Sequence, residues 1–272
     1  MKLYPFRSNL LIAIAITALL SIGVMSCSDD TPTNTDNSSG EIKMYMVDAP
    51  GDYDEVNIVV TEVSVHMSAG DTTIGWMVID SSTRTINLLN LTNGNVDIIG
   101  SGRLHIGSYS QIRLKIGTGS NVVVGGTTHP LEIPSGSQTG LKINHAFDIE
   151  TNVLYELTLD FDASKSIHQT GNGRYMMRPV IRATANRSCG SISGMVNPAS
   201  SFSCVRTMVG SDSLATYAHL MNGGFMLMAL PSGIYTVTIE SGVALYADST
   251  ITGVSVTARN NTNLGTINLR QR

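Results

Sequence analysis

The chain has 272 residues, 42% of them hydrophobic, which is enough to bury one large core or two modest ones. Only 14% are charged, and 17 basic side chains against 21 acidic ones leave a formal charge of −4. The sequence contains no basic patch, aromatic RNA-binding motif or heptad repeat, which argues against a nucleic-acid partner.

The first 26 residues have the order of a secretory signal peptide. Lys2 and Arg7 come first, an apolar block follows from Leu10 to Leu20, and smaller residues precede Cys27. The alternative is a transmembrane helix, but such a helix needs about 20 consecutive apolar residues and this core is shorter. We therefore expect residues 1–26 to be a cleaved signal.

The sequence Val24-Met25-Ser26-Cys27 resembles the lipobox of bacterial lipoproteins. In that family the cysteine is linked to diacylglycerol and acylated at the new N-terminus, so the resemblance implies that Cys27 is the lipid attachment site. Several acyl chains are needed because one chain alone anchors a protein only marginally. Ser28 does not match an inner-membrane retention signal, which implies an outer-membrane lipoprotein facing the periplasm or the cell surface.

Residues 28–40 read SDDTPTNTDNSSG and contain no aliphatic or aromatic side chain. Such a segment cannot bury enough apolar area to offset the entropy that it would lose on ordering. We expect residues 27–40 to be a lipidated cysteine and a flexible tether, whose rms reach is about 20 Å.

Apolar and polar residues alternate with a period of two through most of the remaining chain. The pattern is clear in Gln111–Ile116, Tyr155–Asp162 and Tyr235–Ile239, and it indicates strands with one buried and one solvated face. In Val56–Met67 the apolar phase changes near Val59 and Val60, which predicts a β-bulge or burial on both faces. Turn sequences such as Asn-Gly and Pro-Ser-Gly separate these segments. The predicted fold class is all-β, with two β-sandwich domains in tandem.

The predicted domain boundary lies at residues 185–188, where charge falls and the strand pattern restarts. It divides the chain into domains 41–185 and 186–272. Cys189 and Cys204 lie about fifteen residues apart in the second domain, and two cysteines in an oxidising compartment usually pair. We expect a disulfide between them. The alternatives are two free buried thiols or a zinc site, and the zinc site lacks a spaced set of histidines.

Two parts of the chain resemble known families. MVDAPGDYDEVNIVVTEVSVH (residues 46–66), LLNLTNG (88–94) and PSGSQTGLKIN (134–144) match a domain-of-unknown-function family, number 4382 in that series, found in secreted bacterial lipoproteins. GSISGMVNP (190–198) and NGGFMLMALPSGIYTVTI (222–239) resemble carboxypeptidase regulatory-like and transthyretin-like sandwiches, whose fold class includes some carbohydrate-binding modules. The second resemblance implies an accessory domain, not a catalytic one.

Acidic residues provide the best candidates for a metal site. Asp48, Asp52 and Asp54 lie close together in sequence, and carboxylates converging from loops suit calcium. The competing interpretation is a Pro-Gly turn whose aspartates cap backbone amides, and we prefer it, so no metal or other cofactor is expected. Asp160 and Asp162 fall on the predicted solvated side of their strand. Trp76 is the single tryptophan, and a core position is preferred over a sugar-stacking one.

No catalytic set can be named from the sequence. The six histidines are scattered, and no nucleophile and base share a recognisable motif. We therefore expect a lipid-anchored, non-enzymatic protein of the cell envelope that binds a glycan, a matrix component or a neighbouring envelope protein. The alternative is a structural or assembly component of the outer envelope.

Overall fold

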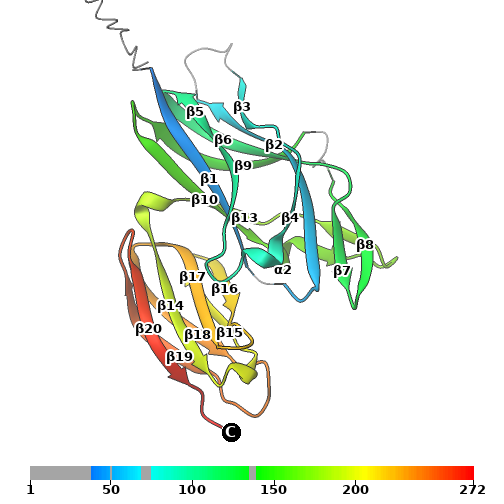
Figure 1. Ribbon diagram of the computed structural model, residues 1–272, viewed down its shortest axis with the longest axis vertical. Helices are drawn as coiled ribbons and strands as arrows, with labels where there is room; N and C mark the ends of the chain where they lie inside the picture. Colours follow the sequence, from blue (N-terminus) through cyan, green and yellow to red (C-terminus); the bar gives the residue numbers. More distant parts are fainter. Residues whose placement is uncertain (1–37, 50, 69–74, 135–138) are drawn as a thin grey trace, which may run out of the picture. The chain divides into compact units, whose positions relative to one another are not determined.

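The computed structural model describes residues 38–49, 51–68, 75–134 and 139–272 (Figure 1). The predicted signal peptide, Cys27 and most of the predicted tether lie outside these residues. Within the described ranges no helix is both long and apolar enough to span a bilayer. The described chain is all-β, as predicted, and its helical segments are single turns: η1 (Leu88–Leu91), α2 (Ala163–Ser166), η2 (Asn186–Ser188) and η3 (Ala199–Ser201).

Two sheets enclose the larger hydrophobic cluster. The first has the strand order β13 (Ile181–Ala185), β10 (Leu154–Asp162), β1 (Ser39–Ala49) and β5 (Asp97–His105). The second runs through β11 (Ile167–Gln169), β12 (Tyr175–Met177), β8 (Thr127–Glu132), β7 (Asn121–Val124), β2 (Glu55–Met67), β6 (Gly107–Ile116) and β9 (Leu141–Ile149), and β3 (Trp76–Asp80) and β4 (Arg84–Asn87) also pair with β2. Their alternating apolar residues meet in a core that includes Met44, Ile58, Leu114 and Phe161.

The predicted irregularity in β2 is present. The register of β2 against β6 shifts between Val60 and Glu62, so the buried side chains change phase along the strand. Ile58 and Val60 are buried before the shift, and Val63 and Val65 after it. The bulge lets one long strand pair with β7 and β4 at one end and with β3 and β6 at the other.

Two smaller sheets enclose a second cluster. One has the order β17 (Gly224–Pro231), β14 (Cys189–Asn197) and β20 (Asn261–Asn268), and the other has the order β16 (Asp212–Tyr217), β15 (Cys204–Val209), β18 (Gly233–Glu240) and β19 (Ser249–Val256). The cluster between them includes Ile192, Val205, Leu227 and Ile239. By its contacts, residues 37–272 form one compact unit, and separate folding of 41–185 and 186–272 stays a prediction.

The turn after η1 joins the two clusters. Asn93 and Gly94 both have positive φ, as an Asn-Gly turn requires. Asn93 Oδ1 accepts a hydrogen bond of 2.9 Å from Thr216 Oγ1 on β16. A Cβ atom on Gly94 would lie 2.9 Å from Met226 Sδ on β17, so the absence of a side chain permits this approach.

The predicted disulfide is absent from the structure, and Cys189 and Cys204 are free thiols. Cys189 lies opposite Pro231, just before β18 begins, whereas Cys204 lies opposite Glu240, where β18 ends. The length of β18 therefore separates them by about 20 Å, far beyond the roughly 7 Å between Cα atoms that a disulfide tolerates. Spacing in sequence suggested a pair, but the hairpin arrangement places the two residues at opposite ends of the sheets.

We predict that both thiols remain unlinked in protein isolated from its native compartment. Burial raises the pKa of each thiol, which also makes both slow to react with oxidants. Mass spectrometry of a non-reduced digest, alkylated after denaturation, should show both peptides carrying the alkyl group. A joined peptide would contradict the strand register described here.

Candidate functional site

A surface trough lies where β9, β13 and β16 approach one another, and we call it the Arg182 trough. One hollow of about 440 Å³ and an adjoining one of about 250 Å³ share Ile181, Arg182 and Asp212. The lining of the first hollow includes the polar side chains of Lys142, Asn144, Arg182 and Asp212. Apolar side chains such as Val180 and Met208 contribute to the second. Hollows of this size suit a small ligand or one residue of a polymer.

The strand register of the first sheet brings the charged side chains of the trough together. Side chains along β10 point alternately to the two faces of the sheet, so Asp160 and Asp162 lie on the same face. Arg182 on β13 is the direct cross-strand neighbour of Asp160. Arg182 Nη2 donates to Asp160 Oδ2 at 3.0 Å. Cross-strand neighbours are close enough for such a pair without distortion of either strand.

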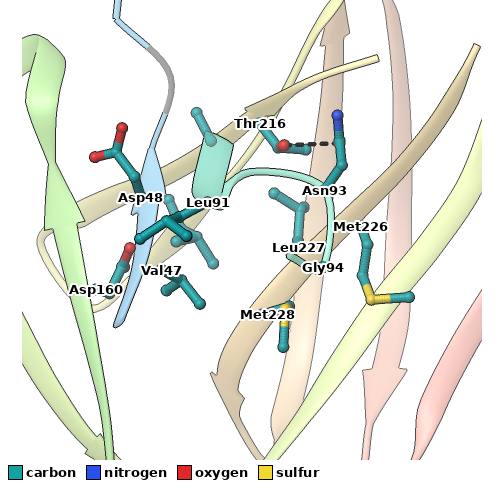
Figure 2. A pocket seen from close by; sticks show the side chains of 12 residues that line it. Val47, Asp48, Leu91, Asn93, Gly94, Asp160, Thr216, Met226, Leu227 and Met228 are labelled. Carbon is teal, nitrogen blue, oxygen red and sulfur yellow. Dashed lines mark hydrogen bonds between the residues drawn. The ribbon is translucent and has the colours of Figure 1, made fainter. Parts of the chain in front are cut away.

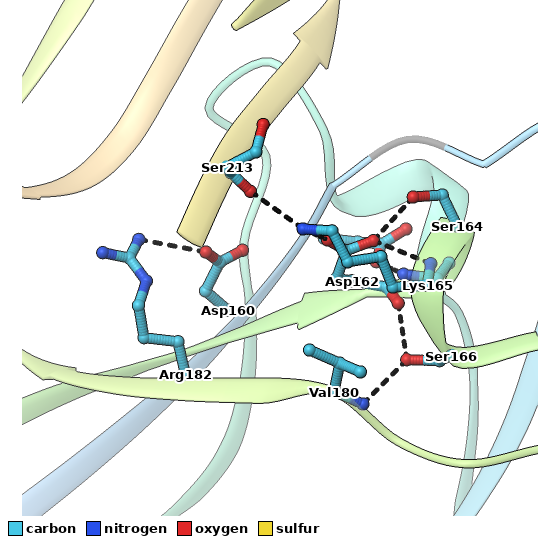
Figure 3. Close-up of polar contacts among 10 residues, drawn as sticks. Asp160, Asp162, Ser164, Lys165, Ser166, Val180, Arg182 and Ser213 are labelled. Carbon is cyan, nitrogen blue, oxygen red and sulfur yellow. Dashed lines mark hydrogen bonds and ion pairs between the residues drawn. The ribbon is translucent and has the colours of Figure 1, made fainter. Parts of the chain in front are cut away.

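Asp162 organises the other end of the trough, as Figure 3 shows. Its Oδ1 accepts from Lys165 N at 3.0 Å and Ser164 Oγ at 2.7 Å, which caps the single turn of α2. Lys165 Nζ lies 2.7 Å from Asp162 Oδ2 and also donates to the Ser213 carbonyl of β16 at 3.3 Å. Lys165 thus connects the first sheet to β16.

The prediction that Asp160 and Asp162 face solvent is wrong. Each is only 8% exposed, because β16 and α2 cover this face of β10. The period-two pattern correctly placed both on one side of the strand, but it carried no information that another part of the chain packs there. Burial raises the pKa of Asp160 to about 6, although the Arg182 guanidinium opposes that rise.

Asp48 lies beside these groups at the end of β1. Its Oδ1 accepts a hydrogen bond of 3.0 Å from Ala163 N, and it is 5% exposed. Burial raises the pKa of the Asp48 carboxyl well above its usual range, and the carboxylates of Asp160 and Asp162 raise it further. Figure 2 shows Asp48 and Asp160 beside a cavity of about 20 Å³ that Asn93 and Met226 line from the other side, which is no larger than a water molecule needs.

Three polar atoms here have no hydrogen-bond partner among the described residues: Asp48 Oδ2, Asp160 Oδ1 and Arg182 Nη1. A buried polar atom without a partner costs free energy, so such atoms are uncommon in native proteins. Asp160 and Arg182 line the trough, but these unpartnered atoms are enclosed by the protein, so a ligand in the trough would not reach them without a rearrangement. The charged groups that the trough exposes to a ligand are those of Lys142 and Asp212.

The acidic residues that the sequence offered as calcium ligands do not converge. Asp48 is buried against α2, whereas Asp54 is exposed and its Oδ2 accepts from Gly126 N at 2.8 Å in the turn between β7 and β8. Asp52 is exposed. Asp48 and Asp54 each accept a backbone N–H, but from Ala163 and Gly126, which are distant in sequence and lie outside the Pro-Gly turn. Across the described ranges, no group of three or more His, Cys, Asp or Glu side chains has an arrangement that could hold a metal ion.

Trp76 is partly exposed on β3, and its ring is not a free platform. The guanidinium carbon of Arg113 lies 4.3 Å from the ring centroid, Lys142 Nζ lies 5.9 Å from it, and His66 makes an edge-on contact. A sugar stacking on the face that Arg113 covers would have to displace a cation–π contact. The tryptophan accordingly stabilises the second sheet through the side chains of β2, β6 and β9.

Comparison with known proteins identifies a family. A model described as a domain of unknown function (DUF4382) matches residues 39–179, slightly more than half of the chain, and the chain belongs to that family. No curated protein matches. The match covers β1 to β12 and most of the residues whose resemblance was noted in the sequence, but it names no activity.

Solved structures with some likeness include a cohesin–dockerin complex and two pilins. A cohesin–dockerin complex from Acetivibrio cellulolyticus is 24% identical over 30% of this chain and 57% of its own, with a TM-score of 0.24. The minor pilin GBS52 of Streptococcus agalactiae is 11% identical over 85% of this chain and 96% of its own, with a TM-score of 0.22. The shaft pilin SpaA of Lactobacillus rhamnosus GG is 8% identical over 86% and 98%, with a TM-score of 0.25. The chain spans less than two thirds of the length of the first of these, and all three likenesses are too distant to carry a functional argument.

We predict that Asp48→Asn stabilises the protein above neutral pH. A carboxyl whose pKa is raised by folding binds its proton more tightly in the folded state, so its contribution to stability falls as the pH rises past the unfolded value. Asparagine keeps the acceptor for Ala163 N and never ionises. The melting temperature of Asp48→Asn should exceed that of the wild type by a few degrees at about pH 8, and the two should converge near about pH 4.

Asp52→Asn is the matched control, because it removes an exposed carboxylate from the same segment. Its melting curve should follow that of the wild type at every pH. An Asp48→Asn variant that is less stable than the wild type at about pH 8 would show that the ionised carboxylate is stabilised there by contacts other than those described.

Proposed function

We propose that this member of the DUF4382 family is a lipid-anchored, non-catalytic binding module of the bacterial cell envelope, and that a glycan is its ligand. The observation that carries the proposal is the Arg182 trough, with the exposed Lys142 and Asp212 side chains that line its larger hollow. The resemblance of Val24–Cys27 to a lipobox supports the proposed lipid anchor and the location in the cell envelope. These two lines are independent, so each has its own test.

The chemistry of the trough favours a neutral, hydroxylated ligand. Arg182 and Lys165 already form ion pairs with Asp160 and Asp162, so little net charge is left to attract an ion. Lys142 and Asp212, the other charged residues of the trough, form no ion pair within the described ranges and provide one charge of each sign. None of the described residues that line the two hollows is aromatic, so hydrogen bonds rather than stacking would hold the sugar.

A non-catalytic role is favoured by the surroundings of the thiols. Cys189 Sγ is 3.9 Å from Ser188 Oγ, and Cys204 Sγ is 3.9 Å from Arg206 Nη2. Neither contact provides a base, and burial raises the pKa of both thiols, which leaves them poor nucleophiles. The part of the chain that the structure describes contributes no histidine to the lining of the trough.

The alternative function, an assembly component of the envelope, is favoured by a different feature of the same region. Among the described strands β9 pairs only with β6 and β13 pairs only with β10, so each presents an open edge beside the larger hollow. An open edge offers unpaired backbone groups to an added strand from another protein. A neighbouring envelope protein would then replace the glycan as the partner.

We predict that detergent-solubilised protein binds a defined subset of neutral glycans on an array. Asp212→Ala and Lys142→Ala should each weaken that binding about tenfold, because a hydrogen bond to a charged group contributes roughly 1.5–3 kcal/mol. Both residues are exposed, and because Lys142 also contacts the Trp76 ring, the melting temperature of each variant should be measured to check that the fold is retained. Arg174→Ala, which removes an exposed arginine paired with Glu132 outside the trough, is the matched control and should bind as the wild type does. A blank array, together with crosslinking of the β9 edge to an envelope protein, would favour the assembly role instead.

We also predict that Cys27 carries the lipid. Cys27→Ser should abolish metabolic labelling with palmitate and release the protein from the membrane fraction or leave it unprocessed. Ser28→Ala, which leaves the cysteine in place, is the control and should be labelled normally. Palmitate retained in Cys27→Ser would contradict the proposed anchor without affecting the trough.

A further inference from the structure

The loops at one end of the two smaller sheets expose an unusual set of apolar side chains. β14 and β20 end there together, because their last residues, Asn197 and Asn268, are paired. β16 and β18 also end there, because their last residues, Tyr217 and Glu240, both pair with Cys204, the first residue of β15. We call the segments 198–203, 218–223, 241–248 and 269–272 the loop tip. In Figure 1 the C-terminus lies beside these strand ends.

Four large apolar side chains are at least half exposed in the loop tip. Met221 is 89% exposed and Leu220 64%, and Leu245 and Phe202 are 57% and 50% exposed. Single exposed apolar residues are ordinary, but a set gathered from three neighbouring loops marks an interaction surface. None of the four lines the Arg182 trough, so the loop tip is a separate feature.

Hydrogen bonds hold these loops in place and tie them to one another. His219 N donates to Gly224 O at 2.8 Å and Gly223 N donates to His219 O at 2.7 Å, so Leu220 and Met221 lie at the end of a closed turn. Gly242 N donates to Ser201 O at 2.9 Å, which joins the Leu245 loop to the Phe202 loop. The backbone hydrogen bonds of these loops therefore hold the apolar side chains in place at the surface.

Arginines border the apolar residues. Arg272 N donates to Leu245 O at 3.0 Å, and Ala247 N donates to Arg270 O at 2.8 Å, which places this segment along the Leu245 loop. Both arginine side chains are exposed and form no ion pair within the described ranges. Two acids are near: Glu240 is paired with Arg206, and the exposed Asp248 accepts a hydrogen bond from Ser241 N.

We propose that the loop tip inserts its apolar side chains into the surface of a lipid bilayer that contains anionic headgroups. The apolar residues project from separate turns and line no described hollow. Such separate projections fit a deformable lipid surface better than the rigid surface of a folded protein. Apolar side chains bordered by guanidinium groups match the acyl boundary and the phosphates of such a surface. This contact is additional to the proposed anchor at Cys27 and does not depend on it.

Flotation with vesicles of equimolar phosphatidylcholine and phosphatidylglycerol tests the proposal. The protein should begin at Ser28, so that no signal peptide or acyl chain is present; it keeps the whole compact unit of residues 37–272. The wild type should float with these vesicles, and the double variant Leu220→Ser, Met221→Ser should bind about tenfold more weakly. Arg270→Ala with Arg272→Ala should weaken binding and reduce its sensitivity to salt.

Two apolar residues elsewhere provide matched controls. Ile234 on β18 is 79% exposed and Val78 on β3 is 53% exposed, so Ile234→Ser and Val78→Ser remove comparable side chains away from the loop tip and should bind as the wild type does. A wild type that stays with the aqueous fraction would overturn the proposal. Equal binding by the Leu220→Ser, Met221→Ser variant, with an unchanged melting temperature, would overturn it as well.

Discussion

The parallel pairing of β1 with β10 is the constraint on which the rest of the site depends. In this register Asp48 is level with Phe161, between Asp160 and Asp162, so three carboxylates gather where the two strands end. Burying them together is unfavourable unless each finds a donor. Ala163 N, the Arg182 guanidinium and the first turn of α2 are those donors.

The donors are recruited from successive parts of the chain. α2 follows β10 directly and brings its amides to Asp48 and Asp162, and β13 returns along β10 to bring Arg182. Lys165 then reaches across to β16, and the Asn93 turn makes a second bridge to the same strand through Thr216. The carboxylate cluster thus ties the two hydrophobic clusters together. It also places Asp160 and Arg182 in the lining of the trough, which connects the electrostatics of the fold to the proposed binding role.

Local patterns in the sequence predicted the local structure well. The period of two identified the strands, the phase change in Val56–Met67 corresponds to a real register shift, and the Asn93-Gly94 turn has the expected positive φ values. These features depend on neighbouring residues only. The Asp48 and Asp54 carboxylates accept backbone amides, but the partner of Asp48 is Ala163, which is 115 residues away and could not be named in advance.

Where the predictions were wrong, the cause was packing between distant segments. Asp160 and Asp162 alternate as solvated residues do, yet β16 covers them. Cys189 and Cys204 are close in sequence, yet β18 separates them in space. The trough was not foreseen because its lining comes from β9, β13 and the start of β16, which no single motif connects.

The most direct test of the binding role is to map where a glycan contacts the protein. Isotope-labelled protein would be titrated with a glycan selected on the array, and backbone amide shifts would be followed by NMR. The account predicts that the perturbed amides cluster in residues 141–144, 180–183 and 211–213. Saturable binding whose perturbed amides lie elsewhere, for example around Trp76, would contradict it.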